Sequence, residues 1–215
     1  MELMDSRSMR PEEIEAESFR IIEKEAGEHD WPDDQWPIVR RAIHTTADYE
    51  YLQSLVITPD AIPSAISALR SGRAIITDTN MALAGIRKDL ASRLGCSLEC
   101  HVADPAIAEE ARASGITRSM AAARCACREN LNGIFVIGNA PTALFELLEQ
   151  VRGAVCRPAL IIGLPVGFVG AEESKNALAI GNYQIPFISN IGRKGGSTVA
   201  AAVMNALLIM AAEQQ

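Results

Sequence analysis

Short apolar runs alternate with alanine-rich helical patterns along most of this chain, and this alternation constrains its fold more than any other feature. The apolar runs cover residues 73–77, 97–102, 133–138, 159–164 and 185–190. Helical patterns cover residues 60–71, 104–113, 118–130, 140–152, 171–181 and 197–212. Strands that alternate with helices form parallel sheets, because each helix carries the chain back across the sheet. The sequence therefore predicts an α/β fold with a doubly wound, mostly parallel central sheet flanked by helices on both faces.

A helical segment precedes this alternation. Residues 11–26 open with Pro11 and two glutamates and end before Gly27, which are start and stop signals of a helix. Its apolar stripe is interrupted by Ser18, whose hydroxyl either bonds back to the carbonyl four residues earlier or serves a ligand. A second, shorter helix is expected after Pro37. On it, Arg41 and His44 are three residues apart and share one face.

The length of 215 residues fits one domain, and we expect an N-terminal tail over residues 1–10 and a single α/β domain over residues 11–215. The 20 Lys and Arg against 27 Asp and Glu give a net charge of −7, which argues against nucleic acid or an anionic membrane as a partner. No apolar stretch is long enough to span a bilayer.

The spacings of the cysteines and histidines indicate the cellular compartment of the protein and whether it holds a metal ion. Five cysteines without a CxxC pair fit a reducing compartment, so a cytoplasmic protein is expected. The three histidines show neither HxxxH nor HExxH spacing, and no protein-held metal site is predicted from them.

Polar and glycine-rich turns follow four of the predicted strands. They cover residues 78–81, 138–142, 163–170 and 192–198. In doubly wound sheets the ligand lies beyond the carboxyl ends of the strands, where these turns are expected to meet. Each turn alone is explained by tight-turn chemistry, but together they favour a functional site. Neither GxxxxGK[ST] nor GxGxxG is present, which disfavours a nucleotide-binding protein.

Seven collinear motifs resemble the precorrin-8X methylmutase family, also called precorrin isomerase, of cobalamin biosynthesis. The resemblance covers residues 11–208. The motifs are HTTADYEYLQSLVITPD, ITDTNMALAGI, VADPAIAEEA, TRSMAAAR, IGNAPTAL, GLPVGFVGAEESKNAL and GRKGGSTVAAAVMNAL. The motifs HTTAD and TDTNM look more similar to the family branch that acts on cobalt-precorrin-8 than to the branch that acts on metal-free precorrin-8X.

The resemblance implies an isomerase, a methylmutase that shifts a methyl group from C11 to C12 of a corrinoid. The product is cobyrinate from cobalt-precorrin-8, or hydrogenobyrinate from precorrin-8X. It further implies a homodimer with active sites near the subunit interface and no separate cofactor, since any cobalt arrives in the substrate. The family's catalytic histidine falls on His44, and two of its substrate-contacting positions fall on Ser18 and Arg41.

Residue chemistry agrees with these roles. Moving a methyl group around a conjugated ring is helped by a proton given and then recovered, and histidine titrates near neutral pH. A corrin precursor carries carboxylates on its rim, so an acidic protein must concentrate cations in its site. Besides Arg41, the cations in the motif turns, expected to bind substrate, are Arg118, Lys175, Arg193 and Lys194.

Two questions stay open at the level of the sequence. Asp48 either orients the His44 ring or caps a helix in the DYEYLQSL stretch that follows. A non-catalytic corrinoid-binding carrier of the same pathway is the alternative to the enzyme, because tight binding of product would serve either function.

Overall fold

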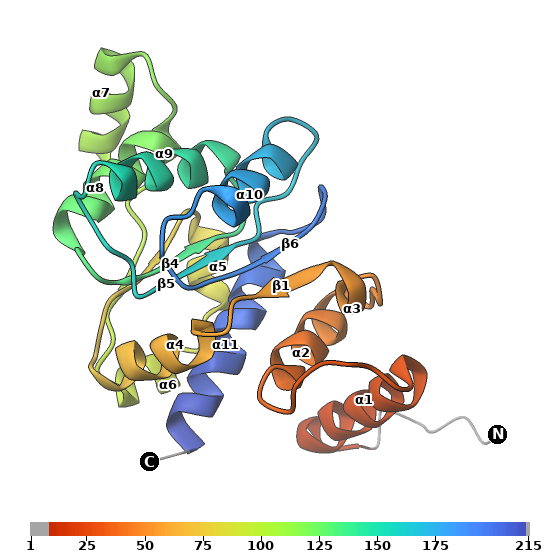
Figure 1. Ribbon diagram of the computed structural model, residues 1–215. Helices are drawn as coiled ribbons and strands as arrows, with labels where there is room; N and C mark the ends of the chain where they lie inside the picture. Colours follow the sequence, from red (N-terminus) through yellow and green to blue (C-terminus); the bar gives the residue numbers. More distant parts are fainter. Residues whose placement is uncertain (1–8, 214–215) are drawn as a thin grey trace.

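The computed structural model of the chain describes residues 9–213 and contains a six-stranded sheet (Figure 1). Its strands are β1 (Leu55–Ile57), β2 (Ile75–Thr77), β3 (Leu98–Glu99), β4 (Ile134–Ile137), β5 (Leu160–Gly163) and β6 (Phe187–Asn190). Their order is β1-β6-β5-β4-β2-β3. All neighbouring pairs are parallel except β1 with β6. The prediction of a mostly parallel sheet is confirmed.

Helices lie on both faces of this sheet. Their bounds are α1 (Pro11–Ala26), α2 (Trp36–Thr46), α3 (Tyr51–Ser54), α4 (Ala61–Arg70), α5 (Asn80–Gly85), α6 (Lys88–Arg93), α7 (Pro105–Ser114), α8 (Arg118–Glu129), α9 (Pro141–Arg152), α10 (Ala171–Ile180) and α11 (Ser197–Glu213). The predicted tail, residues 1–10, lies outside the described residues except for its last two positions. Of these, Arg10 caps the start of α1.

The central strands divide their side chains between two cores. In β4, Ile134 and Val136 join the core beneath α2, α4 and α11, whereas Phe135 and Ile137 join the core beneath α8, α9 and α10. Strand side chains alternate between faces, so near-continuous apolar runs such as IFVI mark a sheet buried on both sides. The doubly wound arrangement predicted from the sequence is confirmed.

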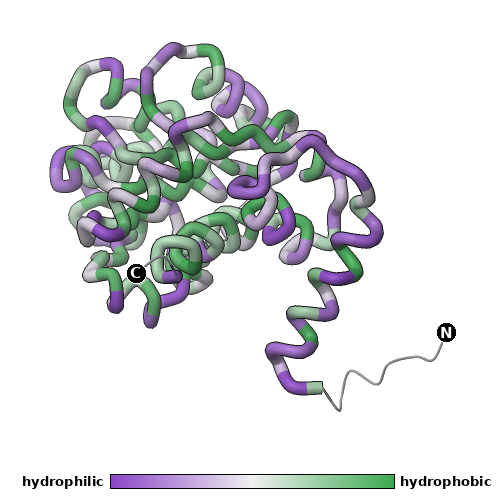
Figure 2. The backbone as a smooth tube through the Cα atoms, turned by 60° about the horizontal axis from the view of Figure 1, so that its bottom comes forward, coloured by the Kyte–Doolittle hydropathy of each residue, from purple (hydrophilic) through white to green (hydrophobic). Residues whose placement is uncertain are grey.

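Helix α11 is the element on which the N-terminal helical segment rests. It is apolar around its whole circumference, and twelve of its seventeen residues are buried. Helix α2 packs against it, with Ile38, Val39 and Ala42 fully buried. Helix α1 packs on α2 and extends away from the body of the molecule (Figure 2). The position of α1 is thus set through α2 rather than by the sheet.

The structure differs from the sequence-based expectation in residues 48–57. A helix over DYEYLQSL was the expected alternative, but α3 has four residues and the chain then extends into β1. Leu55, Val56 and Ile57 pair antiparallel with β6, which gives the edge of β6 a partner. Backbone pairing with β6 outweighs the local helical pattern here. The short helices α5 and α6 were not predicted either.

The turns after the strands meet at one edge of the sheet, as predicted. The buried carboxylate of Asp78 accepts hydrogen bonds from the backbone N–H groups of Gly138, Asn139 and Ala140 at 2.9, 2.8 and 2.7 Å. The Oγ atoms of Thr79 and Ser197 lie 2.8 Å apart. The turns after β2 and β4 and the start of α11 are therefore fixed to one another by buried polar contacts.

Gly138 lies where the turn after β4 touches the start of α11. A Cβ atom at this position would lie 2.7 Å from the Cα of Ser197 and 3.0 Å from the carbonyl oxygen of Gly196. Backbone atoms cannot move aside as a flexible side chain can. We expect Gly138→Ala to lower the free energy of unfolding by about 1–3 kcal/mol, the usual cost of overpacking.

Urea denaturation followed by circular dichroism measures this effect. Gly153→Ala is the matched control, because its added Cβ meets no atom closer than 3.4 Å. We expect the control to stay within about 0.5 kcal/mol of the wild type. Equal stability of the two variants would contradict the proposed tight contact.

Candidate active site

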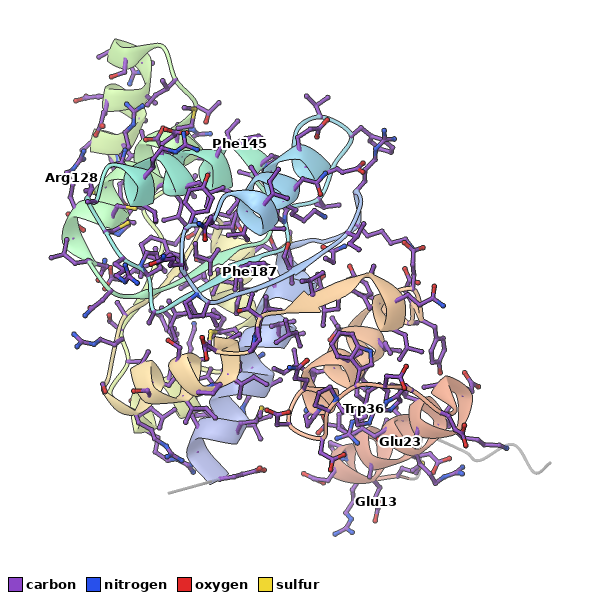
Figure 3. The ribbon with its side chains drawn as sticks, viewed as in Figure 1. Glu13, Glu23, Trp36, Arg128, Phe145 and Phe187 are labelled. Atoms are coloured by element: carbon purple, nitrogen blue, oxygen red, sulfur yellow. The ribbon has the colours of Figure 1, made fainter. Side chains whose placement is uncertain are left out.

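Helices α1 and α2 form the frame of the candidate active site. The indole Nε1 of Trp36 donates to the Glu23 carboxylate at 2.7 Å, and Arg40 donates to the same carboxylate at 2.6 Å (Figure 3). These contacts join the two helices at one end. They fix how the face of α2 that carries Arg41 and His44 meets α1.

His44 lies in the last turn of α2 and is half-buried. Its ring packs edge-on against Phe19, with ring centroids 5.2 Å apart. Among the described residues the imidazole has no hydrogen-bond partner. It lines a cavity of about 360 Å³ whose wall also includes Ser18, Ile22 and Tyr49. An imidazole in this setting is free to exchange a proton with a bound molecule.

Ser18 faces the same cavity from α1. Its hydroxyl donates to the carbonyl oxygen of Ile14 at 2.9 Å, which is the local bond that helix geometry favours. The donation uses the hydroxyl hydrogen and leaves the oxygen lone pairs as acceptors. Ser18 is thus able to receive a hydrogen bond from a ligand without losing its bond to the helix.

Arg41 approaches the site from the preceding turn of α2. Its guanidinium forms an ion pair with Glu15 and lies 4.9 Å from the centroid of the Phe19 ring. Phe19 therefore contacts both Arg41 and His44. Phe19 was not among the predicted site residues, although an aromatic residue next to Ser18 on a largely polar helix was a usable signal.

Lys194 reaches the end of α2 from the turn before α11. Its ammonium lies 2.5 Å from a carboxylate oxygen of Asp48 and 2.7 Å from one of Glu50. The hydrogen bond from Lys194, with a second from the backbone N–H of Glu50, lowers the pKa of Asp48. The Asp48 carboxylate thus accepts the backbone N–H of Glu50 in the turn before α3, whose start has no side-chain cap, and within residues 9–213 it has no hydrogen bond with His44.

Lys175 is almost fully buried in α10. Its ammonium donates to the side-chain oxygen of Asn190 at 3.1 Å and to the backbone carbonyl of Lys194 at 2.7 Å. Burial lowers the pKa of Lys175 to about 8. In the free chain this side chain holds the turn that carries Arg193 and Lys194.

The two remaining predicted cations are Arg118 and Arg193, and none of the five predicted cations is in the lining of the His44 cavity. Arg118 is exposed at the first residue of α8 and has no ionic partner within residues 9–213. Arg193 lies 3.8 Å from a carboxylate oxygen of Glu172 and 5.8 Å from the ring centroid of Phe168. The structure therefore brings Ser18 and His44 to one cavity and links Arg41 to His44 through the Phe19 ring. Lys194 contacts Asp48 and Glu50 after the end of α2, and Arg118, Lys175 and Arg193 lie elsewhere on the carboxyl side of the sheet.

Comparison with known proteins identifies the family. The sequence model of the precorrin-8X methylmutase family matches residues 13–210. The chain belongs to this family. It is 45% identical to the cobalt-precorrin-8 methylmutase of Priestia megaterium, over 95% of this chain and 90% of that protein. It is 46% identical to the cobalt-precorrin-8 methylmutase of Salmonella typhimurium, over 93% of this chain and 95% of that protein.

A solved structure of the family has the same fold. The crystal structure of the precorrin-8X methylmutase of Thermus thermophilus superposes with a TM-score of 0.85 at 37% identity, covering 94% of this chain and 98% of that chain. Membership of the methylmutase family makes the chain an isomerase of cobalamin biosynthesis, as the motifs predicted. These relatives give no support to a non-catalytic carrier. Within the described residues, no helix is long and apolar enough to cross a membrane.

The lowered pKa of Lys175 predicts a pH dependence of stability. Between pH 8 and 10.5 the unfolded chain still binds a proton at Lys175 that the folded chain has released. The free energy of unfolding contributed by this residue therefore rises with pH across that window. We expect Lys175→Met to remove this rise.

The measurement is the difference in free energy of unfolding between wild type and Lys175→Met, followed in urea at several pH values across the window. Lys24→Met, at an exposed lysine of α1, serves as the control and keeps the wild-type slope. A difference that does not change with pH would contradict the assignment.

Proposed function

We propose that this chain converts cobalt-precorrin-8 to cobyrinate by migration of a methyl group from C11 to C12, with His44 as the general acid and base. The observation that carries the proposal is an imidazole that has no hydrogen-bond partner among residues 9–213 and stands at the wall of a cavity shared with Ser18. Arg41, three residues before His44 on the same helix, supplies a cation beside it.

The chemistry needs one proton, used twice. His44 as imidazolium gives a proton to the conjugated macrocycle, which makes the carbon that receives the methyl group electron-poor. The methyl group then migrates with its bonding electrons, and the neutral imidazole recovers a proton from the product. The balance is that of an isomerisation, because no proton is gained or lost overall. A single residue that titrates near neutral pH can perform both steps.

The rim carboxylates of the substrate are assigned to the cations of the motif turns. Arg118 has no ionic partner among the described residues, so binding a carboxylate there breaks no existing ion pair. At Arg41, Arg193 and Lys194 a substrate carboxylate competes with an acidic side chain of the protein. Lys175 contributes by fixing the turn that presents Arg193 and Lys194.

The cobalt-bearing substrate is proposed over the metal-free one on two grounds. The motifs HTTAD and TDTNM look closer to the cobalt branch, and two relatives at 45% and 46% identity are named as cobalt-precorrin-8 methylmutases. Cobalt enters with the substrate in this proposal, and no separate cofactor is assigned to the methyl shift.

The proposal includes a homodimer in the cytoplasm. Phe168 and Val169, in the turn between β5 and α10, are 86% and 89% exposed, and Ile180 at the end of α10 is 82% exposed. Large apolar side chains left this exposed at both ends of α10 support a surface that a second chain covers. Five cysteines without a CxxC spacing favour the reducing cytoplasm.

The role of His44 as general acid and base is tested by comparing the turnover rates of the wild type and His44→Asn. An absorbance time course is recorded with cobalt-precorrin-8 and with precorrin-8X in separate experiments. We expect the wild type to convert the cobalt substrate faster, and His44→Asn to lose about 100-fold or more of that rate, the usual range for removal of a general acid and base.

His29→Asn is the matched control, because His29 stacks on Trp36 at 3.9 Å between ring centroids and lies outside the His44 cavity. It should keep the wild-type rate. Binding of the product cobyrinate should survive in His44→Asn, which separates a lost proton transfer from a lost fold. Normal turnover by His44→Asn would overturn the role of His44, and faster turnover of precorrin-8X would overturn the choice of substrate.

A further inference from the structure

We propose that this chain binds one divalent transition-metal ion of the zinc class through His101 Nε2, Cys125 Sγ and a carboxylate oxygen of Glu129. The three ligand atoms lie within 4.8 Å of one another. The site is separate from the cavity at His44 and goes beyond the methyl shift. It contrasts with the expectation from histidine spacing, which predicted no protein-held metal.

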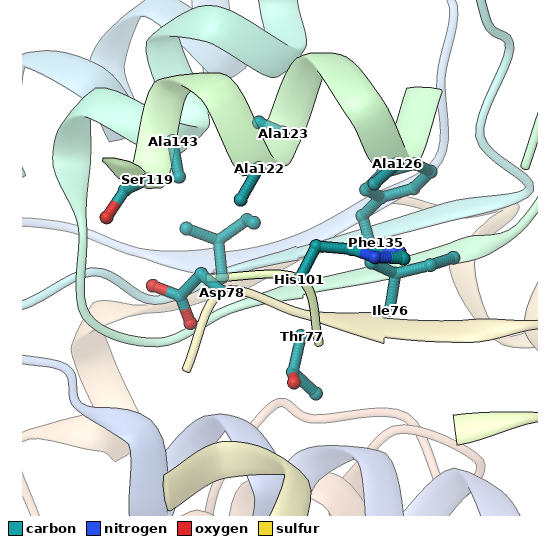
Figure 4. A pocket seen from close by; sticks show the side chains of 11 residues that line it. Ile76, Thr77, Asp78, His101, Ser119, Ala122, Ala123, Ala126, Phe135 and Ala143 are labelled. Carbon is teal, nitrogen blue, oxygen red and sulfur yellow. The ribbon is translucent and has the colours of Figure 1, made fainter. Parts of the chain in front are cut away.

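Two elements bring the ligands together. Cys125 and Glu129 are four residues apart in the last turns of α8, so they share one face of that helix. His101 follows β3 and lies between the sheet and α8 (Figure 4). A sequence separation of more than twenty residues between His101 and Cys125 hid this cluster from motif analysis.

The distances fit four-coordinate geometry. His101 Nε2 lies 3.7 Å from Glu129 Oε2, and Cys125 Sγ lies 3.4 Å from Glu129 Oε1. Zinc binds nitrogen and oxygen at about 2.0–2.2 Å and sulfur at about 2.3 Å, which places tetrahedral ligand atoms about 3.3–3.7 Å apart. An ion therefore fits between these atoms with small movements of the side chains.

The imidazole of His101 has the orientation that is typical of a metal-binding histidine. His101 Nδ1 lies 3.2 Å from a carboxylate oxygen of Asp104, which favours the proton on Nδ1 and turns the lone pair of Nε2 toward the cluster. Nε2 is buried and has no hydrogen-bond partner in the described part of the chain. A buried polar atom without a partner calls for an explanation, and a bound ion supplies one.

Glu99 is in place to supply a fourth ligand. Its Oε2 lies 3.6 Å from His101 Nε2, on the same side of the ring as Glu129. The carboxylate is held by hydrogen bonds from Ser97 and Asn130, each at 2.7 or 2.8 Å. Carboxylates at Glu99, Asp104 and Glu129 surround one imidazole, and a dication balances this negative charge.

The ligand types select the metal. A thiolate and an imidazole favour Zn²⁺ or Co²⁺ over Mg²⁺ and Ca²⁺, which prefer oxygen ligands. Binding forms a metal–sulfur bond and releases the thiol proton of Cys125 to solvent. Burial and the Glu129 carboxylate raise the pKa of the Cys125 thiol, so the metal itself must displace this proton.

The position of the site indicates a structural role. β3 is one edge of the sheet and β1 is the opposite edge, next to the N-terminal helices that carry His44. The cavity that His101 lines together with Asp78 and Phe135 measures about 10 Å³, room for about one water molecule and far too small for a corrinoid (Figure 4). A metal ion here would tie the segment after β3 to the end of α8.

The test uses the full chain, freed of metal with a chelator and then titrated with Co²⁺ and with Zn²⁺. We expect one Co²⁺ per chain, with a thiolate-to-cobalt charge-transfer band in the near ultraviolet. Zn²⁺ should displace it and raise the temperature of unfolding. Cys125→Ser should abolish the band, and Asp104→Asn should weaken binding about 10–100-fold, the usual cost of losing a residue that orients a ligand.

Cys100→Ser is the matched control, because Cys100 is a half-buried free cysteine next to His101 that lies outside the cluster. It should keep the band. Absence of the band in the wild type, or its persistence in Cys125→Ser, would overturn the proposal. If Cys125→Ser does not fold, the number of Zn²⁺ ions bound per chain is measured for His101→Gln instead. Loss of the bound ion supports the proposal, and one ion still bound overturns it.

Discussion

Burial of α11 on all sides is the constraint on which the rest of the structure depends. A helix that is apolar around its circumference must be covered everywhere, and one sheet face covers only part of it. The helices α2, α4 and α5 complete the cover. Each large aliphatic side chain removed from water contributes about 1.5–3 kcal/mol, so the fully buried Ile38 and Val39 hold α2 firmly.

The candidate active site follows from this packing. His44 is located by α2, which α11 locates in turn, whereas Ser18 is located by α1, which rests mainly on α2. Helix α1 buries only Ile22, and its apolar residues Ile14 and Ile21 stay 41% and 42% exposed. One wall of the His44 cavity is thus rigid and the other is held by few buried contacts. Such an open site accommodates a wide, flat substrate better than a closed pocket would.

The parts of the fold that the sequence predicted are those with a strong local pattern. The strands β4 and β5 are apolar runs buried on both faces, and α1 has start and stop signals at both ends. β1 was missed because its pairing with β6 joins residues more than a hundred positions apart. Within the site, the bond from Ser18 to Ile14 was one of the two alternatives that helix geometry left open for this hydroxyl. The contacts of Phe19 were not, because they depend on how two helices cross.

Electrostatics explains how an acidic chain can present cations to an anionic substrate. Arg41 and Lys194 are paired with Glu15, Asp48 and Glu50, so the free protein does not hold uncompensated positive charge around His44. These ion pairs are partly exposed, and such pairs contribute about 0–1 kcal/mol each. A carboxylate on the substrate can therefore replace a protein carboxylate at small cost.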